Sequence, residues 1–151
     1  MNANLKSYRI GQGIKQIEVA EYLKVSKQTV NKWEMGRALI PFAHWFRLST
    51  LLNVTTEGLE KMLVQTILDG CIESGSNRLL LNAKRSRVYN SELIEEALNL
   101  FSMRIGNAVQ ADVERSNNEY ERRIFELERA LLERDKKIFE LEKQLAMNRG
   151  V

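Results

Sequence analysis

A ten-residue segment near the C-terminus occurs twice, fourteen positions apart. RRIFELERAL at 122–131 returns as KKIFELEKQL at 136–145. Fourteen residues are two heptads, so apolar side chains recur on one face of a helix in the phase of a coiled coil. The sequence around the repeat extends the helical pattern from Asn90 to about Asn148, with Gly106 as its weakest point. The repeat therefore predicts a long helix that packs against another helix.

Apolar side chains follow the coiled-coil phase beyond the repeat itself. With Ile124 at heptad position a, most a and d positions over about 113–148 are apolar. These residues are Val113, Tyr120, Ile124, Leu127, Leu131, Ile138, Leu141 and Leu145. We therefore expect this stretch to hold two or more copies of the chain together.

The charges beside the a and d positions indicate how the copies are oriented. Arg123 and Lys137 occupy position g, while Glu128 and Glu142 occupy the following position e. In a parallel pair each basic residue faces an acidic residue of the other copy, whereas an antiparallel pair sets acid against acid. The pattern predicts a parallel dimer or a higher parallel oligomer.

A third apolar column lies at position b, which a two-stranded coiled coil leaves in water. It consists of Phe125, Leu132 and Phe139. Such a stripe is typical of a further contact surface. It could widen the bundle to three or four strands, receive the helix expected near 93–105, or bind a foreign protein. The sequence leaves these alternatives open.

The rest of the pattern is also helical, so we predict an all-α protein in three parts. Residues 1–68 are expected to form a domain of five short helices, the last running from a Thr55/Thr56 cap to about Leu68. Residues 69–90 are expected to be a helical linker region, with a loop or linker at 69–77. A basic stretch follows that loop and could also touch DNA as an arm. Residues 91–148 are the expected oligomerisation region.

Residue counts exclude several classes of function. One cysteine, Cys71, and one histidine, His44, provide neither a disulfide nor a cysteine- or histidine-based metal site, and we expect no cofactor. We expect Cys71 to be an incidental linker thiol and His44 a packing or surface residue. No membrane span or signal-peptide pattern is present, which indicates a soluble cytoplasmic protein. Because no nucleophile or base lies beside the acidic residues, we predict that the protein is not an enzyme.

Residues 16–36, QIEVAEYLKVSKQTVNKWEMG, have the pattern of two short helices joined by a tight turn. Ala20 is small enough to lie where the helices touch, and Ser26 is suited to cap the second helix.

The first 66 residues also carry nine Lys and Arg against five acidic residues, a net charge of +4 that favours a polyanionic partner.

The outer side of the second helix would present side chains that donate hydrogen bonds. These are Lys27, Gln28, Thr29, Asn31 and Lys32. In the major groove of DNA, Gln and Asn can pair with adenine through two hydrogen bonds, and Lys reaches the acceptors of guanine. The motif therefore predicts a helix-turn-helix that reads double-stranded DNA.

Residues 5–66 resemble the helix-turn-helix domain of the phage repressor/Cro (XRE-type) family, and the likeness is most specific over 16–36. The resemblance implies that Gln16 binds a phosphate and that an ion pair joins Arg9 to Glu34. It also implies DNA contacts by a set of residues around the second helix. The set is Gln16, Ser26, Lys27, Gln28, Thr29, Asn31, Lys32 and Arg37. The sequence departs from the family at Lys24, since the turn position there is usually glycine.

These features together predict a sequence-specific regulator of transcription, of phage or mobile-element type, that binds a palindromic operator as an oligomer. Repression is the default mode for the family that the domain resembles. One alternative is an activator of the same architecture. Another is an adaptor or antitoxin-like protein that acts through its coiled coil, without catalysis.

Overall fold

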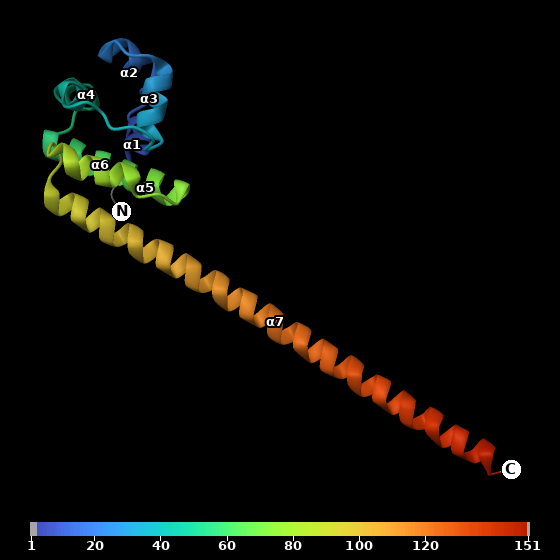
Figure 1. Cartoon of the computed structure of the whole chain (residues 1–151). Helices are drawn as coiled ribbons and strands as arrows, with labels where there is room; N and C mark the ends of the chain where they lie inside the picture. The colour runs from blue at the N-terminus through green and yellow to red at the C-terminus, as the bar shows by residue number, and fades with distance from the viewer. Residues whose placement is uncertain (1–2, 151) are drawn as a thin grey trace. The chain divides into compact units, whose positions relative to one another are not determined.

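The computed structural model describes residues 3–150, and this part of the chain is all-α, which confirms the predicted fold class. Figure 1 shows the order of the helices along the chain. They are α1 (Leu5–Gly11), α2 (Gln16–Leu23), α3 (Lys27–Glu34), the 3-10 turn η1 (Phe42–His44), α4 (Trp45–Leu52), α5 (Thr56–Ser74), α6 (Arg78–Ser86) and α7 (Ser91–Arg149). Within the described residues, no helix is both long enough and apolar enough to cross a bilayer. The chain divides into two units, the first ending at Gly106 and the second beginning at Asn107.

Helix α5 is the centre of the first unit, because α1, α4 and α6 all pack against it. Its apolar face is buried, and Leu59 has no exposed surface at all. The start of α1 is fixed on this helix by a buried hydrogen bond, in which the backbone N–H of Leu5 donates to the Thr66 hydroxyl over 2.8 Å. The hydrophobic core thus joins the helix-turn-helix segment to helices that follow it in the sequence.

The loop expected at 69–77 is largely helix, since α5 continues to Ser74 and ends only at Gly75, which has a φ of +69°. Gly70 does not break the helix because its lack of a side chain is used for packing. A Cβ at this position would lie 2.5 Å from the carbonyl oxygen of Gly36. Cys71 is therefore a buried residue of a helix and not a linker thiol, and burial raises the pKa of this thiol.

The basic stretch after this loop is also a helix, as expected of a helical linker region, but it packs into the core of the first unit and is therefore more than a solvated connector. Leu80 and Ala83 lie on the inner face of α6 and are fully buried. The basic residues are exposed; they are Arg78, Lys84 and Arg85 on α6 and Arg87 at its C-terminal cap. This spacing of apolar and basic residues is that of an amphipathic helix. In the sequence, the local excess of basic residues obscures these two inward positions.

The beginning of α7 completes the core of the first unit. Ile94, Ala97 and Phe101 are buried at helical spacing. Just before the helix, the ring of Tyr89 meets that of Trp45 edge-on, with 5.0 Å between the ring centroids. Burial raises the pKa of Tyr89 to about 12. Helices α6 and early α7 are therefore part of the folded unit that contains the helix-turn-helix.

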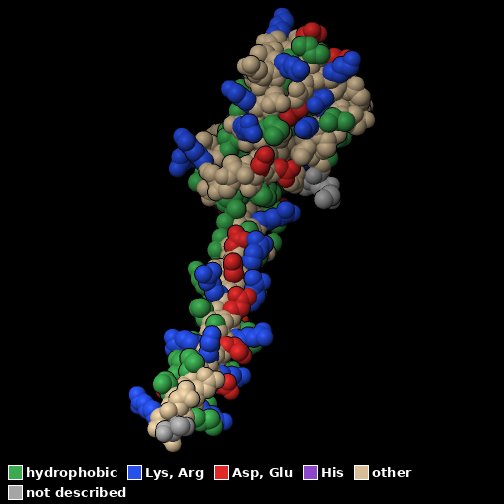
Figure 2. All heavy atoms as spheres, turned by 90° about the vertical axis from the view of Figure 1, so that its right-hand side faces the viewer, with side chains coloured by type: hydrophobic (Ala, Val, Ile, Leu, Met, Phe, Trp, Pro, Cys, Tyr) green, Lys and Arg blue, Asp and Glu red, His purple; other side chains and the backbone are tan. Residues whose placement is uncertain are grey.

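The second unit contains the remainder of α7, and every described residue from Asn107 to residue 150 is exposed. The helix passes Gly106 without a break. In Figure 2, apolar, acidic and basic side chains alternate along this part of the chain. The apolar residues at positions a and d are between 44% and 65% exposed. No contact within the described chain covers them.

Candidate nucleic-acid interface

The turn between α2 and α3 has the geometry of a helix-turn-helix. Ala20 is 2% exposed, and its carbonyl oxygen accepts the N–H of Val25 over 3.0 Å. Between them Lys24 adopts the left-handed conformation with a φ of +56°. Glycine adopts this conformation freely, whereas other L-residues bear a cost of about 1–2 kcal/mol. The sequence departure at Lys24 is therefore accommodated by backbone strain and not by a different turn.

Helix α3 begins at a serine cap, as the sequence predicts. The Ser26 hydroxyl accepts the backbone N–H of Thr29 over 3.1 Å, and the two hydroxyls lie 2.8 Å apart. Thr29 is half-buried. Both side chains thus fix the start of the helix, which is a structural role in addition to the DNA contact expected of them.

The two sides of α3 differ sharply. Val30 and Trp33 face the core and are at most 5% exposed. On the outer side four of the predicted DNA-reading side chains are exposed: Lys27, Gln28, Asn31 and Lys32. Lys and Arg side chains are also scattered over the surface of the first unit in Figure 2. The outer side of α3 can therefore donate hydrogen bonds to an acceptor-rich, negatively charged partner.

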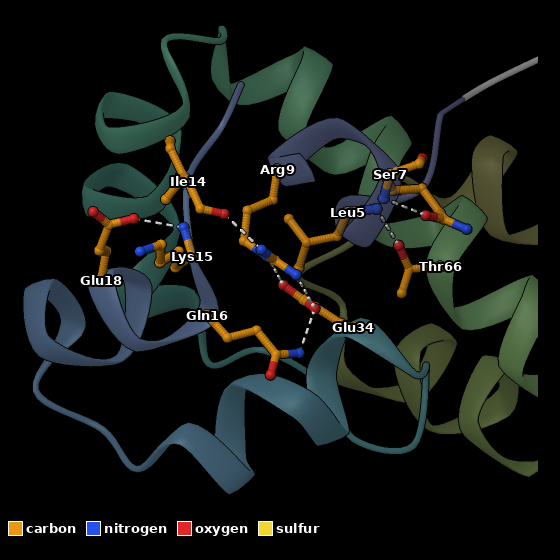
Figure 3. A network of polar contacts seen from close by, with 10 residues as sticks. Leu5, Ser7, Arg9, Ile14, Lys15, Gln16, Glu18, Glu34 and Thr66 are labelled. Carbon is orange, nitrogen blue, oxygen red and sulfur yellow. Dashed lines mark hydrogen bonds and ion pairs between the residues drawn. The ribbon is translucent and has the colours of Figure 1, made fainter. Parts of the chain in front are cut away.

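A buried network joins α1, α2 and α3 beneath this surface (Figure 3). The structure brings Arg9 and Glu34 together in an ion pair, in which the Arg9 Nε and Nη2 groups donate to the two carboxylate oxygens. The side chains are only 9% and 1% exposed. Gln16 also belongs to the network, since its Nε2 donates to Glu34 Oε2 over 2.7 Å. The residue expected to bind a phosphate is thus already held by a buried carboxylate.

The end of α3 packs closely on α5. Gly36 is buried with a φ of +60°, and a Cβ on it would lie 2.2 Å from the carbonyl oxygen of Thr66. The following residue, Arg37, is exposed, and its backbone N–H closes the helix end by donating to the Lys32 carbonyl oxygen over 2.9 Å. The close contact leaves Arg37 at the surface beside the end of α3.

Residues 5–59 match the family model for the helix-turn-helix. The N-terminal domain is an XRE-type helix-turn-helix domain. Such a domain binds double-stranded DNA, so the protein is a DNA-binding regulator of the XRE type. Neither the curated proteins nor the solved structures include a match to the chain.

Three features of the XRE-type domain are not apparent from sequence reasoning. One is Gly70, which lies outside the matched segment and contacts Gly36. The second is the hydrogen bond between Gln16 and Glu34. The third is Arg47, whose guanidinium carbon lies 5.1 Å from the centroid of the Tyr22 ring and joins α4 to α2. All three depend on tertiary proximity, for which the sequence carries no local signal.

Proposed function

We propose that the protein represses transcription by binding a palindromic operator as a parallel dimer. In this proposal α3 of each copy enters a major groove, and the C-terminal helices hold the two copies together. Occupation of a promoter by the dimer blocks transcription.

The outer side of α3 supports the reading of bases. Gln28, Asn31 and Lys32 are exposed on one helix whose opposite side is anchored in the core. Bidentate contacts of such side chains with base edges discriminate between bases by about 1–3 kcal/mol each. In the same proposal Gln16, which is half-buried, and Arg37, which is exposed, contact phosphates beside the helix. Such contacts hold the domain on DNA without distinguishing sequences.

The exposed heptad positions of α7 support dimerisation, and they are the observation on which the proposal chiefly depends. Long helices in proteins are stabilised mainly by the packing of an apolar face, and the face of α7 beyond Gly106 has no partner within the described chain. A second parallel copy would cover the a and d residues and pair the charges at g and e. Two linked domains then bind adjacent half-sites with a gain of about 10²–10⁴ over one domain.

The test is selection of binding sites from a pool of random duplexes by the full-length chain. We expect an inverted repeat with half-sites one DNA turn, or a multiple of it, apart. A reporter with the selected site across its promoter should be repressed. Failure to enrich any sequence would favour the adaptor, and stimulation of a reporter with the site placed upstream would favour the activator.

A pair of variants tests base reading on the selected site. Gln28→Ala should weaken specific binding by about 1–3 kcal/mol and leave random DNA nearly unaffected. Gln12→Ala is the matched control, because it removes an exposed glutamine outside α2 and α3. Equal losses of affinity on both DNAs for Gln28→Ala would show that Gln28 does not contact a base.

A further inference from the structure

Glu34 lies at a junction that connects a buried ion pair to the DNA-facing surface. Its carboxylate accepts three hydrogen bonds, two from Arg9 and one from Gln16. Arg9 uses a further N–H, on Nη1, to donate to the carbonyl oxygen of Ile14 over 2.6 Å. Figure 3 shows these groups converging from the segment before α2, from α1 and from the end of α3. The start of α2 is thereby fixed at two points, by Arg9 at Ile14 and by Glu34 at Gln16.

We propose that Glu34 is a positioning residue for DNA binding, which acts by orienting the Gln16 amide toward a phosphate of the DNA backbone. The inference rests on the proposed function, because it explains what orients the phosphate contact that the proposed function assigns to Gln16. Glu34 itself is buried, with a side chain only 1% exposed, so in this proposal it acts without touching the DNA.

The chemistry of the amide explains how one group serves both purposes. A glutamine Nε2 carries two N–H donors. One donates to Glu34 Oε2, which fixes the plane of the amide, and the other N–H is left for a phosphate oxygen. Gln16 is half-buried and its bond to Glu34 is only partly buried, so the residue is anchored below while part of it remains exposed. A side chain that is ordered before binding avoids the entropy cost of being immobilised by the ligand.

The hydrogen bond between Gln16 and Glu34 also connects the proposed phosphate contact to α3. Gln16 is the first residue of α2, and Glu34 is the last residue of α3. A direct bond between these ends sets the position of α3 relative to the phosphate that Gln16 binds. In this arrangement Glu34 determines how accurately the bases are presented to α3, although it contacts none of them.

The test separates the ion pair from the contact with Gln16. Arg9→Met/Glu34→Gln removes the ion pair but keeps an oxygen that can accept from Gln16. Arg9→Met/Glu34→Leu removes both. On random duplex DNA at fixed salt, the first variant should bind within about twofold of the unaltered protein, and the second about tenfold more weakly, the usual size of a hydrogen bond to a charged group.

Adding Gln16→Ala shows whether the effect passes through Gln16. It should cost about tenfold in the unaltered chain and in the Glu34→Gln background, and nothing further in the Glu34→Leu background. The salt dependence should stay unchanged throughout, because a neutral amide displaces no counterion. If Gln16→Ala has no effect in the unaltered chain, the phosphate contact of the proposed function is wrong. If it costs tenfold there while the Gln and Leu variants bind equally, the positioning role is wrong.

A measurement on the unaltered chain keeps the inference testable if a variant does not fold. In NMR relaxation of the free full-length protein, the Gln16 side-chain amide should be as rigid as the backbone, while that of Gln28 should be mobile. Equal mobility of the two amides would overturn the positioning role.

Discussion

The two units of the chain differ in the burial of their apolar side chains. In the first unit the apolar residues of α5, α6 and early α7 are buried against one another, with Leu59, Leu80 and Ile94 completely inaccessible. In the second unit apolar residues recur just as regularly, yet every described residue is exposed. The first pattern is completed within one chain, whereas the second requires a surface from outside it.

This difference means that the stability of the two units depends on different variables. The first unit has its own core, so its folding should be independent of protein concentration. The coiled coil that we propose for the second unit forms between copies, so its stability rises with concentration.

Removal of the second unit should have the largest effect. A chain that stops after residue 110 keeps the core of the first unit, which ends at Gly106. We expect a monomer by sedimentation and a loss of operator affinity of about 10²–10⁴, because the two domains are no longer linked. Weak binding should persist at high protein concentration. If the shortened chain remains a dimer and binds at full strength, dimerisation lies within residues 1–110.

Loss of one partner of the buried ion pair should destabilise the first unit strongly. Arg9→Met leaves the Glu34 carboxylate uncompensated, and we expect a loss of about 3–5 kcal/mol in the free energy of unfolding by urea. Arg9→Met/Glu34→Leu should cost less, because no buried charge remains unpaired. Arg85→Met, at an exposed arginine of α6, is the control for removing a guanidinium. A double variant less stable than Arg9→Met would contradict this account.

Reversal of the charges at position e should weaken the dimer without affecting the first unit. Glu128→Lys/Glu142→Lys places like charges opposite Arg123 and Lys137 of a parallel copy. We expect a loss on the order of 1 kcal/mol in dimer stability, which is greatest at low salt. The matched control is Glu119→Lys/Glu140→Lys, which changes the net charge equally at position c. Equal effects of the two variants would show that the copies are not parallel in this register.

A glycine in the turn should stabilise the first unit slightly. Lys24→Gly relieves a left-handed strain of about 1–2 kcal/mol, and the greater freedom of glycine in the unfolded chain offsets about 0.5–1 kcal/mol of it. We expect a net gain of about 0.5–1 kcal/mol in urea unfolding. Lys24→Ala, which removes the same side chain without freeing the backbone, should give no gain. An equal gain from both would assign the effect to the lysine side chain.

The smallest effect on assembly is expected at position b. The stripe of Phe125, Leu132 and Phe139 faces away from a two-stranded seam, and these residues are between 58% and 69% exposed. Their joint replacement by Ser should leave the dimer intact and change operator affinity by no more than about twofold. Such a result would assign the stripe to an outside partner. Dissociation into monomers would place it in the oligomer core.

The features that the sequence predicts correctly are those with a local or periodic signal. Heptad spacing predicts the helix that runs to Arg149, and the Ser26 cap predicts the start of α3. The Arg9–Glu34 pair is different, since only the family resemblance points to it. Five polar positions on α3 follow from helical spacing alone, and the structure leaves four of them exposed.

The features that the sequence does not predict depend on contacts between distant segments. In the sequence Gly70 has the character of a loop residue, and its helical role follows only from its contact with Gly36. The many basic residues around α6 likewise give no indication that Leu80 and Ala83 are buried. The simultaneous hydrogen bonds of Glu34 with Arg9 and Gln16 cannot be predicted locally, because the three residues lie on three different helices.

The contact between Gly36 and Gly70 has a consequence for anyone who wishes to move this domain into another protein. A graft of residues 5–59, the segment that defines the family, would cut α5 within its first turn and leave Gly36 and the buried side of α3 open to water. The smallest portable module therefore extends at least through Gly75, where α5 ends. Redesign of the positions proposed to read DNA should keep both glycines fixed, because a methyl group at either one would push α3 away from α5.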